Sequence, residues 1–222
     1  FAQPLSELGA TVIATVPEHL RGLLKNVPGI SNCYSTSQPA PQADFQCTVM
    51  ELPRWLKIDE TNIPLSNGYL QASKDEPGLI DFCEGLGDAL KVGIVWAGNP
   101  NHVNDSRRSM AFDDFACLLD IPNIRLVSLQ IGQAAEQLHM HPRRAEVAEY
   151  LTPGVTPCET ASLIANLDLV ITVDTFVAHL AGALNVPTWV CLALSPDWRW
   201  LTGRADSPWY QSVRLFRQDE KA

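Results

Sequence analysis

Residues 167–184 read LDLVITVDTFVAHLAGAL, in which a short apolar segment runs directly into a segment with helical spacing. Residues 167–173 are almost wholly apolar and rich in β-branched side chains, which is typical of a strand buried on both faces of a parallel sheet. A helix is predicted to follow, with Asp174 or Thr175 as its N-cap. The stretch therefore predicts a strand-to-helix junction at these two residues.

Such a junction favours the binding of an anion. The N–H groups of the first helical turn lack partners, and the aligned peptide dipoles attract negative charge. In open α/β sheets, ligands bind at the carboxyl ends of the strands. We therefore expect a phosphate group near Asp174 and Thr175, with His179 one turn further along. The alternative is that Asp174 only caps the helix and that His179 is an ordinary core or surface residue.

The rest of the chain shows the same alternation of strands and helices. Strands are expected at residues 10–16, 31–35, 45–50, 91–97, 124–129, 147–151 and 188–192. Helices are expected at residues 17–26, 52–57, 79–90, 112–119, 132–138 and 160–166, with the tail of another at residues 1–8. The short links between them indicate an α/β fold with a doubly wound, mostly parallel sheet, and residues 66–78 are interpreted as a connector.

Composition excludes several classes of protein. The chain has 222 residues, of which 46% are hydrophobic and 18% charged, as in a globular protein of one large or two modest domains. Its net charge of −9 argues against nucleic acid as a partner. The six cysteines show no zinc-like spacing and are interpreted as reduced, mostly buried thiols, although their even number leaves disulfides open. No apolar run approaches membrane-spanning length, so we expect a cytoplasmic protein that is not transmembrane.

A polar loop follows the strand predicted at residues 91–97. Gly98 would let the backbone approach a ligand, and Asn99 and His102 offer hydrogen-bonding groups. Arg107 and Arg108 supply positive charge, and the planar guanidinium group can bond two phosphate oxygens at once. The alternative is a solvated turn.

Two further segments are candidates for ligand contacts. Gln130 follows the strand at residues 124–129 and could contact a base or sugar, although a structural turn is the favoured interpretation. Residues 195–210 contain four aromatic residues and two arginines, which could stack on a base and pair with phosphate. The alternative is that this segment packs across a domain boundary. Packing is the favoured role of Trp200 and Trp209, whereas both roles stay open for Trp198 and Arg199.

Four segments together resemble a known family. They are GIVWAGNPNHVNDSRRS at residues 93–109, SLQIG at 128–132, the stretch at 168–190, and DWRW with SPWY at 197–210. This pattern resembles the glycosyltransferase-like domain that follows tetratricopeptide repeats in many bacterial proteins. It is similar to the heptosyltransferases of glycosyltransferase family 9 and, more distantly, to protein O-GlcNAc transferases. The resemblance covers nearly the whole chain and is most specific between residues 92 and 210.

The resemblance implies the GT-B architecture, in which two Rossmann-like domains face each other across a cleft. Residues 1–75 would form the acceptor-side, N-terminal domain, and residues 76–222 the domain that binds the nucleotide sugar. In the family a strand and a Gly-rich turn open the N-terminal domain, and these would precede Phe1. We therefore expect a truncated N-terminal domain, without the edge on which heptosyltransferases carry their candidate catalytic carboxylate.

The resemblance also implies a donor site. The residues that it places at the diphosphate or sugar are Asn99, His102, Arg107, Ser109, Asp174, Thr175 and His179. Contacts with the base or donor are suggested for Gln130, Trp198 and Arg199. GT-B chemistry requires no bound metal or other cofactor, and the sequence has no Asp-x-Asp motif. The catalytic base is unassigned; His102 and His179 are the remaining candidates, and phosphate stabilisation is the first role expected of both.

Three functions are compatible with these residues and with the resemblance. The first is a glycosyltransferase of the hexosyl, heptosyl or GlcNAc class, which transfers a sugar from a nucleoside diphosphate to a glycan, a lipid-linked sugar or a protein. Such an enzyme could work at the surface of the inner membrane and carry upstream tetratricopeptide repeats. The second is a sugar-nucleotide-binding module without turnover, since this chain could lack its own base. The third, by fold analogy alone, is a sugar-nucleotide epimerase.

Overall fold

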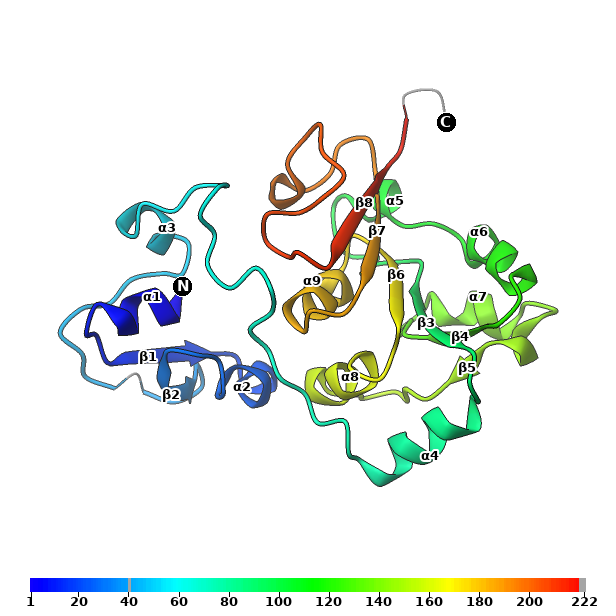
Figure 1. The fold of residues 1–222 in the computed structure, drawn as a ribbon, viewed down its shortest axis with the longest axis horizontal. Helices are drawn as coiled ribbons and strands as arrows, with labels where there is room; N and C mark the ends of the chain where they lie inside the picture. Colours follow the sequence, from blue (N-terminus) through cyan, green and yellow to red (C-terminus); the bar gives the residue numbers. More distant parts are fainter. Residues whose placement is uncertain (40, 220–222) are drawn as a thin grey trace.

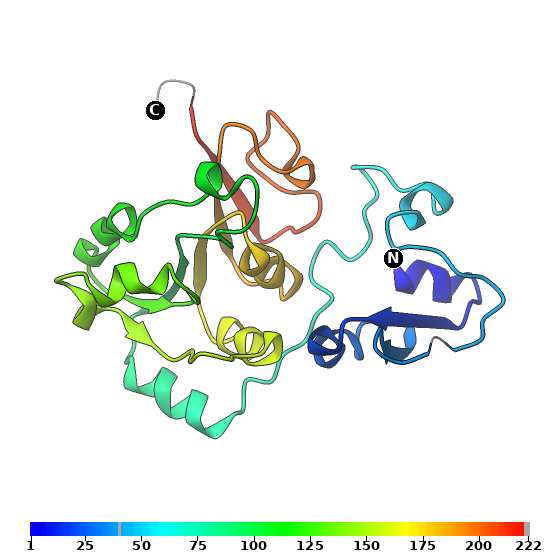
Figure 2. The same cartoon turned by 180° about the vertical axis from the view of Figure 1, so that it is seen from behind.

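The computed structural model describes residues 1–39 and 41–219, and it contains two parallel sheets (Figure 1). The small sheet pairs β1 (Val12–Val16) with β2 (Ile30–Ser35). Three helices belong to the same part of the chain: α1 (Ala2–Glu7), α2 (Glu18–Leu24) and α3 (Leu52–Trp55). Both views show this part beside the larger one, with an extended connector between them (Figures 1 and 2). The domain boundary expected near residue 75 stays a prediction.

The large sheet has six parallel strands in the order β5-β4-β3-β6-β7-β8. Their bounds are β3 Leu90–Val95, β4 Ile124–Ser128, β5 Ala148–Glu149, β6 Leu169–Val173, β7 Thr188–Leu192 and β8 Val213–Arg217. Counted within this sheet, the order is 3-2-1-4-5-6, the Rossmann order. The predicted doubly wound α/β fold is therefore confirmed. The direction of winding reverses between β3 and β6, which makes their carboxyl ends the switch point where such sheets bind ligands.

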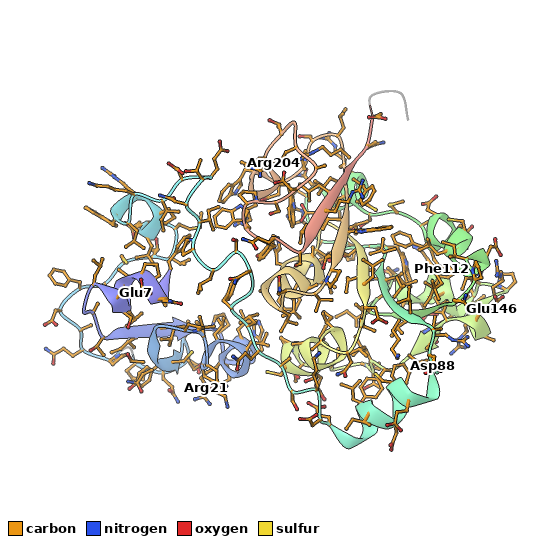
Figure 3. All side chains as sticks on the ribbon, viewed as in Figure 1. Glu7, Arg21, Asp88, Phe112, Glu146 and Arg204 are labelled. Carbon is orange, nitrogen blue, oxygen red and sulfur yellow. The ribbon has the colours of Figure 1, made fainter. Side chains whose placement is uncertain are left out.

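Helices cover both faces of this sheet, because the side chains of its strands alternate between the two faces and are apolar on both. On one face, the buried strand residues pack with α4 (Pro77–Gly85), α8 (Pro157–Ile164) and α9 (Phe176–Ala183). On the other, Ile94 and Trp96 of the β3 segment pack with α6 (Phe112–Ala116) and α7 (Ala135–His139). Phe112, which is labelled in Figure 3, belongs to this second core and is 1% exposed.

Helix α8 shows how local sequence sets an element's start. Thr156 accepts a hydrogen bond from the Glu159 N–H at 3.3 Å, and the Glu159 carboxylate accepts one from the Thr156 N–H at 2.7 Å. These reciprocal bonds form a capping box, which satisfies two donors that the helix itself leaves unpaired. Hydrogen bonds from Thr156 also lower the pKa of the Glu159 carboxyl. The helix therefore begins three residues earlier than the sequence pattern predicted.

Some expectations were wrong. Residues 45–50 form no strand in the structure, and Phe45 is 94% exposed there. A lone extended segment leaves its backbone groups without ladder partners, so β-propensity alone does not make a strand. Helix α4 ends at Gly85 instead of residue 90, because the chain turns at Gly87 with φ +72°. Strand β8 and the short helix α5 (Asp105–Arg108) were not predicted.

Two predictions about composition can be compared with the structure. The six cysteines are free thiols in the described structure, as expected, but Cys47 and Cys117 are exposed and the other four are only half-buried. The expectation of mostly buried thiols was therefore wrong. Within residues 1–39 and 41–219, no helix has both the length and the apolar character that a membrane span requires.

Candidate functional site

The junction between β6 and α9 lies at the switch point of the large sheet. Thr175 is the N-cap of α9, as predicted, with an extended backbone at φ −138° and ψ 176°. Its hydroxyl lies 3.2 Å from that of Thr172 and accepts no capping hydrogen bond within the described chain. The N–H groups of Phe176 and Val177 have no acceptor within the helix, whereas the Ala178 N–H donates to the Thr175 carbonyl at 3.1 Å, so this helix end retains two donors that a ligand can use.

A guanidinium group is held against this junction. Arg108 donates from Nη1 to the carbonyl oxygen of Asp174 at 2.9 Å, and its Nε lies 3.2 Å from the Asp105 carboxylate. The Arg108 side chain is only 19% exposed, so its charge is fixed in place. This one contact joins the loop after β3 to the start of α9, which are 66 residues apart in sequence.

Arg107, which was expected to contact the donor, is exposed at the preceding position on α5. Successive residues on a helix point about 100° apart, so only one of the two arginines can face the junction. The structure places Arg108 there and leaves Arg107 in solvent. Both arginines had been recognised as a source of positive charge. The short helix α5, which decides which of them faces the junction, had not been predicted.

The loop after β3 is braced by its own side chains. The Gly98 N–H donates to the Ser109 hydroxyl at 2.9 Å. A Cβ atom at Gly98 would lie 2.5 Å from the Asp105 carboxylate and 2.6 Å from Arg108 Nη2. Glycine is therefore needed here so that this ion pair can pack on the backbone. Gly98 was expected to leave room for a ligand, but the Asp105 and Arg108 side chains fill that space.

Asn99 and His102 are exposed on the same loop. The Asn99 side-chain oxygen accepts from the Asn101 N–H at 3.0 Å, and His102 Nδ1 accepts from the Asn104 N–H at 3.2 Å. Both side chains therefore shape the loop locally. Their contacts with a donor stay a prediction.

Gln130 has a structural role. Its side-chain oxygen accepts from the N–H groups of Trp96 and Ala97 at 3.1 and 2.9 Å. Its amide nitrogen donates to the carbonyl oxygens of Ala97 and Ile131 at 3.1 and 3.0 Å. The buried amide thus ties the end of β4 to the end of β3, which favours the structural alternative over a contact with a base.

His179 lies one turn into α9. Its ring stacks on Trp200, with centroids 4.9 Å apart and an interplanar angle of 12°, and Nδ1 lies 3.2 Å from the Tyr210 hydroxyl. Burial is the main cause that lowers the pKa of His179, opposed by the charges of Asp174 and Asp197 and assisted by Arg199. The ring is therefore neutral near pH 7, and no carboxylate within the described residues hydrogen-bonds it as in an activated general base.

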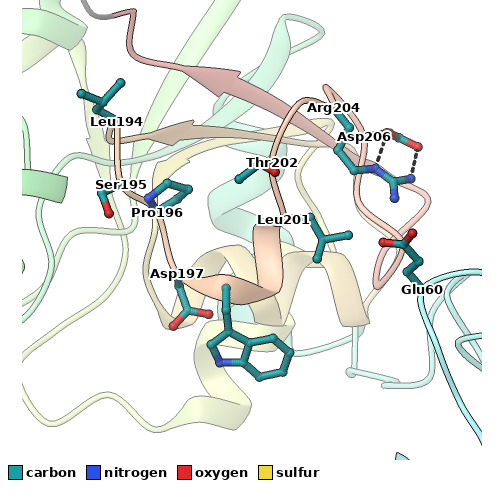
Figure 4. A pocket seen from close by; sticks show the side chains of 10 residues that line it. Glu60, Leu194, Ser195, Pro196, Asp197, Leu201, Thr202, Arg204 and Asp206 are labelled. Carbon is teal, nitrogen blue, oxygen red and sulfur yellow. Dashed lines mark hydrogen bonds and ion pairs between the residues drawn. The ribbon is translucent and has the colours of Figure 1, made fainter.

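A hollow of about 700 Å³ opens beside the carboxyl end of β7 (Figure 4). Its lining residues are Glu60, Leu194, Ser195, Pro196, Asp197, Trp198, Leu201, Thr202, Arg204 and Asp206. Glu60 belongs to the N-terminal part of the chain, whereas the others follow β7. Figure 4 shows the paired Arg204 and Asp206 at one rim, near Glu60.

The aromatic residues after β7 fall into an exposed group at the hollow and a packed group, largely as predicted. Trp198 is 55% exposed at the hollow, and Arg199 lies over its ring at 4.6 Å while pairing with Asp197 at 2.9 Å. Trp200 is fully buried, and Trp209 packs edge-on against Trp198 with centroids 6.1 Å apart. The packing role expected for Trp200 and Trp209 is confirmed. That of Trp198 and Arg199 in ligand binding stays a prediction.

The His, Cys, Asp and Glu side chains of residues 1–39 and 41–219 include no group of three or more arranged to hold a metal ion. Metal-independent chemistry stays a prediction.

The chain is similar in sequence to a known protein of greater length. No family model matches the chain. Over 181 residues it is 30% identical to protein FlbA of Caulobacter vibrioides, a match that covers 78% of this chain and 30% of that protein. The chain therefore spans about 30% of the length of this relative.

The structure of ADP-heptose lipopolysaccharide heptosyltransferase II from E. coli is similar, with a TM-score of 0.63 and 14% sequence identity. This likeness covers 99% of our chain and 85% of the enzyme. The chain has a heptosyltransferase-like GT-B fold.

Proposed function

We propose that this chain binds a nucleoside-diphosphate sugar at the β6–α9 junction and serves as a glycosyltransferase. The observation that carries the proposal is the hydrogen bond from Arg108 to the Asp174 carbonyl. It holds a positive charge beside an uncapped helix N-terminus, at the switch point of a Rossmann sheet. Free N–H donors, a helix dipole and a guanidinium group together suit a diphosphate.

The same groups suit the chemistry of transfer. The oxygen of an acceptor hydroxyl attacks the anomeric carbon, and the bond from that carbon to the phosphate oxygen breaks. The nucleoside diphosphate leaves with additional negative charge, and the hydroxyl proton passes to water. Fixed donors and cations stabilise this charge without a large rearrangement. We assign that role to the first turn of α9 and to Arg108.

Asp174 has a different part in this proposal. A carboxylate repels phosphate oxygens, so its side chain does not bind the diphosphate directly. It can instead accept hydrogen bonds from hydroxyl groups of the sugar, while its backbone carbonyl stays with Arg108. The sugar, the base and the acceptor, whether a glycan, a lipid-linked sugar or a protein, belong to the proposal as classes only. Upstream tetratricopeptide repeats would add a surface for a protein partner.

Calorimetric titration tests the proposal. We expect at least one sugar from a panel of adenosine, uridine and guanosine diphosphate sugars to bind, and Asp174→Ala to weaken that binding about tenfold, the effect of losing a hydrogen bond to a charged group. Asp44→Ala removes an exposed carboxylate elsewhere and serves as the control. Absence of heat with every donor, or equal affinities of the two variants, would overturn the proposed site.

Turnover is measured separately. Release of nucleoside diphosphate with an acceptor extract indicates transfer. Binding without release indicates a non-catalytic module, and interconversion of free sugar nucleotides indicates an epimerase; either result contradicts the enzymatic part of the proposal.

A further inference from the structure

His179 has one edge engaged in the protein and one edge accessible. Nδ1 lies 3.2 Å from the Tyr210 hydroxyl. Within the described residues Nε2 has no hydrogen-bond partner, yet it is not among the fully buried atoms that lack one. Nε2 is therefore not fully buried, and it is the ring nitrogen that remains for a ligand. The stacked Trp200 ring limits how far the imidazole can move.

Tyr210 is held in place by α9 and by the connector. Its ring packs so closely on Gly182 that a Cβ atom there would lie 2.8 Å from both Cδ atoms. The neighbouring Tyr69 contributes, after burial, to the raised pKa of Tyr210. Tyr69 is anchored in turn, since its N–H donates to the Ala183 carbonyl at 2.9 Å.

The connector is also fixed on its other side, because the Gln211 N–H donates to the Ser66 carbonyl at 2.8 Å. The position of the Tyr210 hydroxyl is thus determined from two directions.

The chemistry of the two groups indicates which one donates. A neutral imidazole has one N–H and one lone-pair nitrogen, and the lone-pair nitrogen is the stronger acceptor. A phenol hydroxyl is a good donor, and burial raises the pKa of Tyr210, so its proton is retained. Burial lowers the pKa of His179, with Asp174, Asp197 and Arg199 as the charged neighbours, so the ring is neutral. This chemistry favours donation from Tyr210 to Nδ1, with the ring hydrogen on Nε2.

We propose that Tyr210, supported by Tyr69, is a positioning residue that holds His179 as the tautomer with hydrogen on Nε2, so that the ring presents an N–H donor beside Asp174. This inference rests on the proposed function, which places a diphosphate at the start of α9. It also assigns His179 a single role. A ring whose Nδ1 is occupied and whose Nε2 carries hydrogen stabilises the leaving group and does not accept the acceptor's proton.

Nuclear magnetic resonance of protein labelled with nitrogen-15 histidine tests the tautomer without any ligand. We expect the His179 signals to show hydrogen on Nε2 and a lone-pair Nδ1 at a pH above the ordinary histidine pKa of about 6.5. In Tyr210→Phe the Nδ1 signal should change and the ring should protonate at higher pH, because the hydrogen bond that favours the neutral form is gone. Hydrogen on Nδ1 in the unmodified protein, or an unchanged spectrum and titration in a folded variant, would overturn the proposal.

Two further variants make this result specific. Tyr150→Phe removes a hydroxyl from a ring that packs against Phe82, and it should leave the His179 signals unchanged. Tyr69→Phe should change them less than Tyr210→Phe, because only Tyr210 contacts the ring, and a larger effect would contradict the role proposed for Tyr210.

Titration with ADP, UDP and GDP separates this proposal from the function on which it rests. Tyr210→Phe should weaken the tightest of them about two- to tenfold, the range expected for one ordinary hydrogen bond. If the spectra behave as expected but none of the three nucleotides binds the unmodified protein, the tautomer assignment holds and the proposed function fails. If a nucleotide binds and the variant binds it equally well, the role of Tyr210 is wrong and the function stands.

Discussion

Replacement of Arg108 by alanine should weaken the binding of a nucleoside diphosphate by roughly 30-fold. A hydrogen bond between a guanidinium group and a phosphate contributes about 1.5–3 kcal/mol. Arg108 is 19% exposed and already shares its charge with Asp105, so we expect about 2 kcal/mol, and each 1.4 kcal/mol is tenfold in affinity. Calorimetric titration with the tightest of ADP, UDP and GDP measures the change. The salt dependence of the affinity should also decrease, because one cation less contacts the phosphates.

Arg107→Ala is the matched control, because it removes the same charge one residue away from an exposed position. We expect it to change the affinity less than about threefold, as is usual for exposed charges. Urea unfolding must show that Arg108→Ala remains folded, since it leaves the Asp105 carboxylate, which is 14% exposed, without its partner. An equal or larger loss for Arg107→Ala, or an unchanged affinity for folded Arg108→Ala, would refute the assignment.

Two other outcomes test the packing around His179. Gly182→Ala should lower the free energy of unfolding in urea by roughly 1–2 kcal/mol, because the added methyl group overlaps the Tyr210 ring. Gly85→Ala is the control: its methyl group has no atom within 4 Å and should not destabilise the protein. Equal stabilities of the two variants would contradict the close contact. Burial lowers the pKa of His179 in the folded state, so the unfolded chain binds the proton first. The contribution of neutral His179 to the free energy of unfolding should be fully present above about pH 6.5. It should decrease as the pH falls from there toward the folded-state pKa, and below that pKa it should decrease no further. Comparison of urea unfolding across pH for the unmodified protein and His179→Gln measures this, and identical pH profiles would show that the ring is not desolvated.

Local patterns predicted most of the large sheet. The segments that became β4, β6 and β7 are short, apolar and rich in β-branched residues, and a strand buried on both faces needs little beyond that composition. Residues 45–50 have a similar composition but form no strand, and β8 formed without having been predicted. The two segments differ because β8 has a neighbouring strand to bond with: it pairs with β7 along five residues.

The candidate site was only partly predictable. Asp174 and Thr175 could be found because strand and helix are consecutive in sequence, so their junction is a local feature. The choice between Arg107 and Arg108 depends on the rotation of α5 relative to a junction 66 residues away.

The sequence by itself determined the alternation of strands and helices and the position of the helix N-terminus that could bind an anion, because both follow from the periodicity and capping of neighbouring residues. Only the tertiary structure decided which cation faces that helix end and that Tyr210 packs on Gly182 with its hydroxyl beside His179. Those contacts join segments far apart in the chain. Their geometry is set by the packing of the sheet and the connector, which local side-chain preferences do not encode.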